Sequence, residues 1–386
     1  MGAARSAMSV STKPSSVHAR RIDLDVVRGL AILLAVGWHF NIVTEVALLD
    51  FVLYPGRAIG WAGVDIFFVL SGFLVGRMIL EEYGSTGEFN YKDFFVRRVF
   101  RLWPVLYLYL FLKLAAGEPF EDFFLQVALH FQNFFDLKSS KHLWSLAVEE
   151  HFYVLLALMV PVLMRMNIPA RKTLPIFFAI LALGQLSRIL GVYLGADPVQ
   201  VQLQTQYRLD ALACGVILGH LSLFNPDYFA ELCRKKRLWA GVALGCAAFL
   251  ANVDYHSALG GTVSFTLSYV MGAALLLLAY DSGVERWAKT PSKIMAFLGQ
   301  IAYTLYIWQS VGAKAVAKAL DVLPLPFLSE EYVAAVFVIA TYAVSIIMSW
   351  LITITLERPF MALRDRIVPR RKHAVSDPRA ALTPQD

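Results

Sequence analysis

The chain has 386 residues, of which 58% are hydrophobic and 17% are charged, and its mean hydropathy is +0.58. This composition excludes an ordinary soluble domain and predicts a polytopic membrane protein. The formal net charge of +6 is accounted for by basic loops at a membrane surface, so it does not call for a nucleic-acid partner.

Ten apolar segments are long enough to cross a bilayer, which takes roughly 17 to 25 residues each. They cover approximately 26–43, 60–81, 99–116, 144–164, 173–193, 207–224, 237–252, 263–280, 294–312 and 333–355. The predicted fold is therefore all-α, a transmembrane helix bundle of about ten spans. Most of the 35 Lys and Arg residues fall on one side of this arrangement. By the positive-inside rule both termini are predicted to be cytoplasmic.

Two tails are predicted to flank a membrane domain of residues 22–360. Residues 1–21 combine serines with scattered basic groups, and residues 361–386 are polar, which predicts disordered cytoplasmic tails. No A-x-A-like cleavage site follows the first apolar run, so we do not expect a secretory signal. The three cysteines lack CxxC spacing and predict neither a disulfide framework nor a zinc site.

The first apolar segment contains two polar groups, Arg28 and His39. On an α-helix they would share one face about 16 Å apart. A charged side chain at bilayer depth costs on the order of 2.5 to 3.5 kcal/mol, so both should face protein or a wet cavity. In the alternative interpretation, Arg28 reaches the headgroups and His39 hydrogen-bonds a neighbouring helix as an ordinary core residue.

The second segment carries Asp65 and Ser71 within the glycine-rich run GVDIFFVLSG. Glycines at helical spacing allow close helix packing, which explains the run without any chemistry. Asp65 is expected near the outer end of the span, where water could solvate it. We nevertheless count both polar residues as candidate substrate-binding groups.

The third segment begins with RRVFRLWP, in which Arg98 and Arg101 are three residues apart on one helix face. Two guanidinium groups placed this way can bind phosphate groups with paired hydrogen bonds. Ordinary positive-inside anchoring with an interfacial tryptophan is the competing explanation.

The fourth segment begins WSLAVEEHFY and contains Trp144, a candidate substrate-binding residue, and Glu149 and Glu150, two candidate catalytic acids. Adjacent acids point in different directions on a helix, so one at most should face the arginine and histidine of the first segment. The other is explained by capping or an interfacial position. The segment 117–143 before it is the longest predicted outer loop.

Three further candidates lie in later segments. Arg208 and Asp210 are expected at the outer face of the sixth, where they pair with each other or line a vestibule. Tyr303 lies on the ninth, in the block LGQIAYTLY. The chain then ends its last span with LERPF at 356–360.

No P-loop, GxGxxG, HExxH or GxSxG occurs in a fitting context, which excludes the usual NTPase, Rossmann, zincin and hydrolase classes. The ordered blocks instead resemble the acyltransferase-3 family of integral-membrane acyltransferases over roughly residues 22–360. The matching blocks are Arg28 with His39, GVDIFFVLSG at 63–72, RRVFRLWP at 97–104, WSLAVEEHFY at 144–153, RLDALACG at 208–215, LGQIAYTLY at 298–306 and ERPF at 357–360.

The resemblance implies an enzyme of the bacterial inner membrane that transfers an acyl group, most commonly acetyl, from acyl-CoA to a hydroxyl of a glycan or glycolipid such as lipopolysaccharide or exopolysaccharide. It implies that His39 is catalytic, that Arg28 is essential and that Arg98 and Arg101 serve acetyl-CoA, with no metal. Many members carry histidine where this chain has Gln309. If that histidine serves acceptor choice or proton transfer, the resemblance does not extend to those aspects, whereas His39 is unaffected.

The implied reaction agrees with the residues. A sugar hydroxyl needs a base to attack a thioester, and histidine suits this task near neutral pH. Donors such as Arg28 or nearby amides could stabilise the oxyanion, and Glu149 or Glu150 could orient His39. A transporter is the rival class, because buried Arg, His, Asp and Glu also mark proton and substrate pathways. No repeat symmetry or pair of broken helices supports that alternative.

Overall fold

A computed structural model describes residues 21–44, 46–117, 120–135, 140–254, 257–323 and 328–369. Within these ranges the regular elements are helices and no strand is present, which confirms the predicted all-α class. The predicted disordered tails lie largely outside the described residues.

The long helices follow the predicted apolar segments. They are α1 (Ile22–His39), α3 (Gly63–Thr86), α4 (Tyr91–Ala115), α6 (Trp144–Arg165), α7 (Leu174–Tyr193), α9 (Leu209–Phe224), α11 (Lys236–Leu250), α12 (Phe265–Ala279), α14 (Lys289–Val322) and α15 (Glu330–Ile352). Each of the ten segments falls on one of these helices.

Shorter elements connect the long helices. The α-helical ones are α2 (Ala47–Ile59), α5 (Gln126–Ala128), α8 (Pro198–Leu203), α10 (Pro226–Arg234), α13 (Val284–Trp287) and α16 (Arg358–Ile367). Turns of 3-10 or π-helix are η1 (Gly60–Ala62), η2 (Phe120–Leu125), η3 (Gln132–Phe134), η4 (Lys141–Leu143), η5 (Ala170–Lys172), η6 (Thr205–Tyr207), η7 (Gly260–Ser264) and η8 (Thr353–Glu357). The predicted outer loop at 117–143 thus contains four short helical pieces in its described part.

Five helical stretches in the described residues are long and apolar enough to cross a membrane. They are Ala47–Thr86, Lys141–Arg165, Ala170–Tyr193, Gly260–Ala279 and Tyr332–Ile367. A sixth is formed if α9 and α10, which meet at a bend of 117°, count as one span. The predicted number of about ten is therefore not confirmed. One reason is charge, because the 18 residues of α1 include two aspartates and an arginine.

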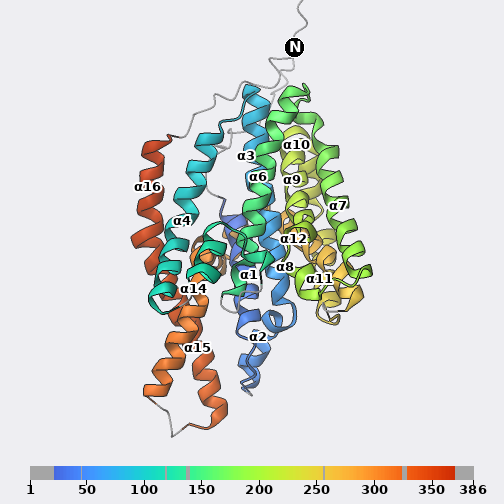
Figure 1. Ribbon diagram of the computed structural model, residues 1–386. Coiled ribbons are helices and arrows are strands. Elements are labelled where there is room, and N and C mark those ends of the chain that lie inside the picture. Colours follow the sequence, from blue (N-terminus) through green and yellow to red (C-terminus); the bar gives the residue numbers. More distant parts are fainter. Residues whose placement is uncertain are drawn as a thin grey trace, which may run out of the picture.

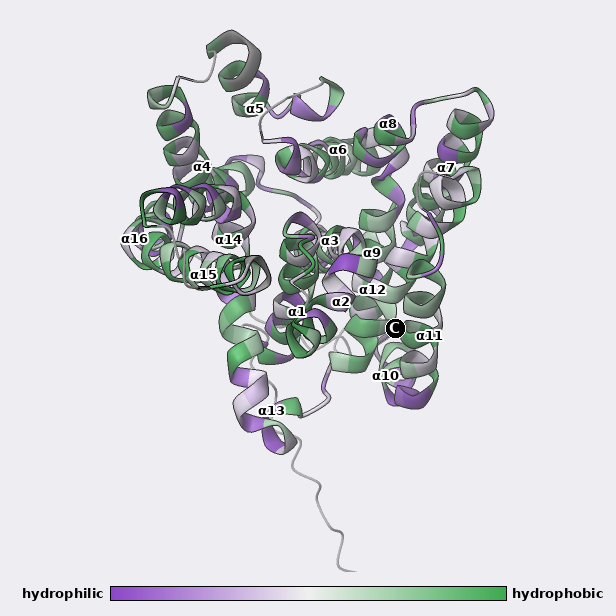
Figure 2. Cartoon of the chain, turned by 90° about the horizontal axis from the view of Figure 1, so that it is seen from below, coloured by the Kyte–Doolittle hydropathy of each residue, from purple (hydrophilic) through white to green (hydrophobic). Residues whose placement is uncertain are grey.

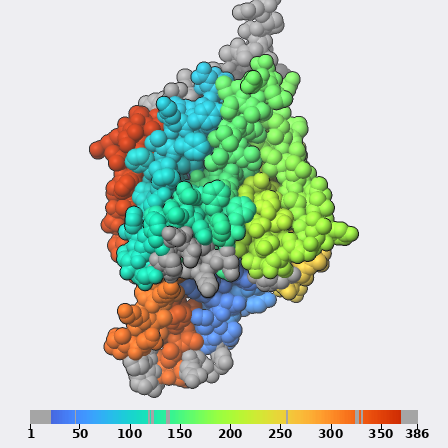
Figure 3. Space-filling model, in the orientation of Figure 1, coloured from blue at the N-terminus to red at the C-terminus, as the bar shows by residue number. Residues whose placement is uncertain are grey.

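The helices run side by side along a common direction, and the lower ends of α14 and α15 extend beyond the others (Figures 1 and 3). Seen along this direction, most of the helices are made of hydrophobic residues (Figure 2). Large apolar side chains remain exposed on the outer helices, among them Leu183 on α7 and Ile347 on α15. A bilayer would cover such surfaces, as expected for a membrane protein.

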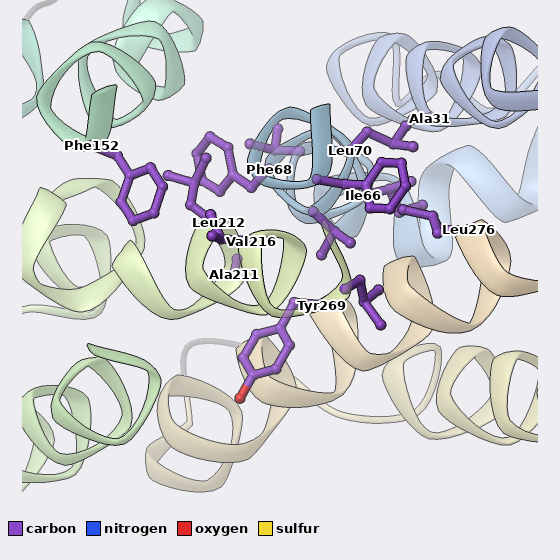
Figure 4. Close-up of a cluster of buried hydrophobic side chains, with 14 of the residues drawn as sticks. Ala31, Ile66, Phe68, Leu70, Phe152, Ala211, Leu212, Val216, Tyr269 and Leu276 are labelled. Carbon is purple, nitrogen blue, oxygen red and sulfur yellow. The ribbon is translucent and has the colours of Figure 1, made fainter. Parts of the chain in front are cut away.

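Small residues let the central helices approach closely. A Cβ atom on Gly72 of α3 would lie 2.0 Å from the carbonyl oxygen of Leu212, and one on Gly215 of α9 would lie 2.1 Å from that of Val69. Figure 4 shows the apolar side chains that fill the space around this crossing. The glycine run of the second predicted segment therefore serves helix packing.

Two element ends differ from the predicted boundaries. Helix α1 begins before position 26 and ends at His39, so the histidine is its last residue rather than an interior one. Helix α16 continues to Ile367, which makes the start of the predicted C-terminal tail helical. Pro359 in the first turn of α16 favours this continuation, since proline is well tolerated there.

Candidate active site

Helix α1 carries Arg28 and His39 on a rigid support. It packs chiefly against α14, and a Cβ atom on Gly29 would lie 2.0 Å from the carbonyl oxygen of Met295. Arg28 Nη1 donates a hydrogen bond to Oδ1 of the buried Asp25 at 2.8 Å. About 16 Å of helix then separates Arg28 from His39, so the two cannot act on the same atoms.

The His39 imidazole is exposed and has a second histidine beside it. The ring of His142 lies perpendicular to that of His39, with 5.8 Å between the ring centroids. His142 itself is buried. As the last residue of α1, His39 also lies at the negative end of the helix dipole, which favours a positive charge there.

Hydrogen bonds continue from this histidine pair into the bundle. The Tyr306 hydroxyl donates to the carbonyl oxygen of His142 and accepts a hydrogen bond from Ser145 Oγ at 2.9 Å. One turn further along α6, Glu149 Oε1 accepts a hydrogen bond from Ser71 Oγ at 2.9 Å. Buried polar groups linked in this way avoid the cost of unsatisfied hydrogen bonds in an apolar interior.

Arg98 and Glu150 form an ion pair between α4 and α6. Arg98 donates from Nε and Nη2 to Glu150 Oε1 at 3.2 and 3.1 Å, and its guanidinium carbon lies 3.5 Å from the ring centroid of Tyr153. Both charged residues line a cavity of about 410 Å³, together with His130 and Trp103. His39 is not among the residues that line this cavity.

Arg101 differs from Arg98, because it pairs with no acid in the part of the chain that the structure describes. Its side chain is exposed, and among the described residues it makes no hydrogen bond or ion pair. It interacts electrostatically with Arg98 of the same helix, with Arg28 of α1 and with Glu357 of η8. Glu357 is buried and accepts hydrogen bonds from Thr304 at 3.1 Å and from Thr353. An unpaired guanidinium at a convergence of helices is available to an anionic ligand.

Tyr303 of α14 lies in the same region, where its hydroxyl donates to the carbonyl oxygen of Leu102 at 2.6 Å. We call the polar groups of this part of the bundle the polar column. Its members are His39, His142, Tyr306, Ser145, Ser71, Glu149, Glu150, Arg98, Arg101, Arg28, Tyr303 and Glu357. The column runs from the end of α1 towards the beginning of α4.

Three of the predicted substrate-binding residues form a separate group, which we call the charge cluster. Arg208 makes an ion pair with Asp65, and Asp210 makes one with Arg188 at 2.5 Å. Ser268 donates to the second oxygen of Asp65. These four charged side chains are at most 2% exposed, so Asp65 is not at a wet outer boundary. Arg208 and Asp210 pair with other helices rather than with each other.

Trp144 lies between these two groups. It is buried, its ring centroid is 5.9 Å from that of Phe68, and the guanidinium carbon of Arg208 lies 5.6 Å from its ring centroid. Its surroundings are therefore those of a packing residue on the side of the charge cluster.

The structure brings most of the predicted catalytic and donor-binding residues into one column, with one difference in contacts. The hydrogen bonds of Glu149 and Glu150 in the described chain run to Ser71 and Arg98, not to His39. The neighbour of His39 is His142, which was not predicted as a site residue. Its place two residues before the WSLAVEEHFY block was the available signal.

The fold thus defines a helical protein with membrane-crossing helices and a column of charged and titratable groups inside them. A family model described as an acyltransferase domain matches residues 21–354. The chain belongs to this family, the acyltransferase-3 family, as the ordered sequence blocks predicted.

Three relatives illustrate the similarity. The peptidoglycan O-acetyltransferase OatA of Listeria monocytogenes is 26% identical over 349 residues, which cover 82% of this chain and 53% of that protein. The "Putative peptidoglycan O-acetyltransferase YrhL" of Bacillus subtilis is 31% identical over 225 residues, 52% of this chain and 33% of that protein. A "Putative O-acetyltransferase" of Staphylococcus aureus is 27% identical over 278 residues, 64% and 45% of the two chains. This chain therefore spans about half the length of these relatives or less. No solved structure matches it.

Proposed function

We propose that this protein is a membrane O-acyltransferase that moves an acyl group, most often acetyl, from acyl-CoA to a hydroxyl of a cell-envelope or exported glycan. The observation that carries the proposal is the imidazole of His39, exposed beside the buried His142, at one end of a polar column that has Arg98 and Arg101 near the other. The names of the relatives, two of which include peptidoglycan, support a glycan acceptor.

His39 is the proposed general base. Its neutral nitrogen takes the proton of the acceptor hydroxyl while the hydroxyl oxygen attacks the carbonyl carbon of the thioester. The bond between carbon and sulfur then breaks, and the imidazolium returns the proton to the CoA thiolate. Because His39 ends α1, the helix dipole favours the imidazolium that forms between these steps.

Arg101 and Arg98 are the proposed donor-binding residues. Arg101 is exposed and makes no hydrogen bond or ion pair with the described residues, so it can bind a phosphate group of CoA directly. Arg98 is already held by Glu150, which leaves part of its guanidinium for the ligand and fixes its direction. Arg28 is closer to this end than to His39, so we assign it to donor binding rather than to the oxyanion.

We assign the remaining polar residues by their contacts. Ser71 and Glu149 are hydrogen-bonded to each other, and we assign them to the substrate between the two ends of the column. Tyr303 borders the donor end. Asp65, Arg208 and Asp210 are sealed by their own ion pairs. We infer that they hold the site together rather than contact the substrate.

For the membrane arrangement we propose ten spans, with α1, α4, α11 and α14 crossing in addition to the more apolar helices. Their charged residues face the interior of the bundle or its ends, as in Arg28 and Arg98, which lowers the cost of placing them in a membrane. Both termini would then be cytoplasmic in the bacterial inner membrane, where acyl-CoA is available.

The test is acetyl transfer in membranes that contain the protein. Labelled acetyl-CoA is supplied, and the acetyl content of envelope glycans is measured by mass spectrometry. We expect transfer with the wild type and a loss of roughly 100-fold or more with His39→Ala, since general base catalysis is worth about 10²–10⁴ in rate. The control is His220→Ala, a buried histidine on α9 that hydrogen-bonds a backbone carbonyl.

Two results would overturn the proposal. Unchanged transfer by His39→Ala would remove its catalytic role. A wild type that transfers no acetyl group but moves a solute across the membrane would favour the transporter class instead.

A further inference from the structure

Two hydrogen bonds and one ring contact fix His142, in addition to its contact with His39. Its ring Nε2 donates to the carbonyl oxygen of Ile307 at 3.2 Å, because a carbonyl can only accept. Its own carbonyl accepts a hydrogen bond from Tyr306. The ring of Tyr109 lies perpendicular to it, with 6.3 Å between centroids. Helices α4 and α14 thus fix both the backbone and the ring plane of His142.

His39 has no such support of its own. It is the last residue of α1, its side chain is exposed, and it makes no hydrogen bond among the described residues. The perpendicular ring of His142 at 5.8 Å is its one aromatic contact there. A base on an exposed helix end loses effectiveness when it rotates freely, because misplacement by about 1 Å can lower a rate by about 100-fold.

We infer that His142 is the positioning residue of the reaction, a fixed ring against which His39 is aligned towards the acceptor hydroxyl. The inference rests on the proposed function of His39 and adds a second histidine to it. The Nε2 proton of His142 is held by the carbonyl oxygen of Ile307, so this nitrogen does not exchange a proton with the substrate.

The groups around His142 favour a neutral imidazole ring that is held in one position. The titratable or charged side chains that face it are His39 from α1, Tyr109 and Lys113 from α4, and Tyr306 from α14. No carboxylate of the described chain pairs with its ring. A positive charge on His142 would lie near the positive charge of Lys113 and near that of a protonated His39, so the neutral ring suits the site.

The experiment compares His142→Ala, His142→Phe and the control His220→Ala in the membrane acetyl-transfer assay. His220 is a matched control, because it is also buried and its Nε2 also lies 3.2 Å from a backbone carbonyl oxygen, that of Arg171. We expect His142→Ala to lower kcat by about 10- to 100-fold with little change in KM for acetyl-CoA. Because phenylalanine keeps a ring beside His39, His142→Phe should recover a large part of that loss.

Unfolding midpoints of the detergent-solubilised variants separate positioning from loss of fold. The inference is overturned if His142→Ala transfers at the wild-type rate, if its loss matches that of His220→Ala, or if KM for acetyl-CoA rises in proportion to the loss. It is also overturned if phenylalanine restores nothing. Full activity of His39→Ala is a different result, because it refutes the proposed function itself.

Discussion

The polar column and the charge cluster both place charged side chains deep in a helical bundle, yet their contacts differ. In the charge cluster each charge has an opposite partner on another helix, as in Arg208 with Asp65, and the side chains are sealed from solvent. In the polar column, His39 and Arg101 are exposed and make no hydrogen bond or ion pair in the described chain. Paired charges stabilise one arrangement of helices, whereas unpaired ones remain free for a ligand.

The largest effect is expected from a substitution that breaks the charge cluster. Asp65→Ala leaves Arg208 buried beside Phe265 without its partner. Breaking a buried ion pair costs about 3–5 kcal/mol. We expect a large fall in the unfolding midpoint of the purified protein, measured by thermal denaturation in detergent.

The control for this prediction is the exposed ion pair of Glu231 and Lys235, with 2.8 Å between its charged atoms. Glu231→Ala should leave the midpoint unchanged, because solvent screens such pairs. If the Asp65→Ala protein were as stable as the wild type but unable to transfer acetyl groups, this prediction would be wrong. Asp65 would then be a substrate-binding residue.

A smaller effect is expected at the donor end of the polar column. Arg101→Ala removes an unpaired guanidinium that we assign to a CoA phosphate. Hydrogen bonds to charged groups contribute about 1.5–3 kcal/mol, so KM for acetyl-CoA should rise about 10- to 150-fold, measured by initial rates. The unfolding midpoint should not fall, because Arg101 has no ion pair within the described ranges to lose.

Arg77→Ala supplies the comparison, since Arg77 is a partly buried arginine of α3 whose hydrogen bonds run to Ser222 and Tyr280 outside the column. Its KM for acetyl-CoA should equal that of the wild type. If Arg101→Ala lowered stability instead of donor affinity, the distinction between the two regions would not hold.

The smallest effect is expected in the middle of the column. Ser71→Ala removes the hydrogen bond to Glu149, which is 2.9 Å long. We expect a loss of transfer of at most about 10-fold, in line with 0.5–1.5 kcal/mol for one hydrogen bond. A double-mutant cycle with Glu149→Gln measures the coupling of the two residues. Strictly additive losses would show that this hydrogen bond does not contribute to the reaction.

The comparison of the two regions also shows which contacts could not be predicted from the sequence. Arg208 and Asp65 were both singled out from sequence, but their separation of 143 residues hides that they pair. The same holds for Arg98 and Glu150, which are 52 residues apart. Which acid meets which base depends on how helices pack, and a run of sequence carries no signal for that.

By itself, the sequence determined the helical class, the positions of the long helices and the family. Apolar length and the order of motif blocks are local properties, and these are sufficient for such conclusions. It also placed Arg98 and Arg101 on one helix face, because their spacing is set by the helical repeat. Only the tertiary structure decided that His39 ends its helix beside His142, that Arg101 forms no ion pair with the described residues, and that Asp65, Arg208 and Asp210 are sealed in a separate cluster. Those features depend on contacts between helices far apart in the chain, where close packing at glycines such as Gly72 and Gly215 selects which side chains meet.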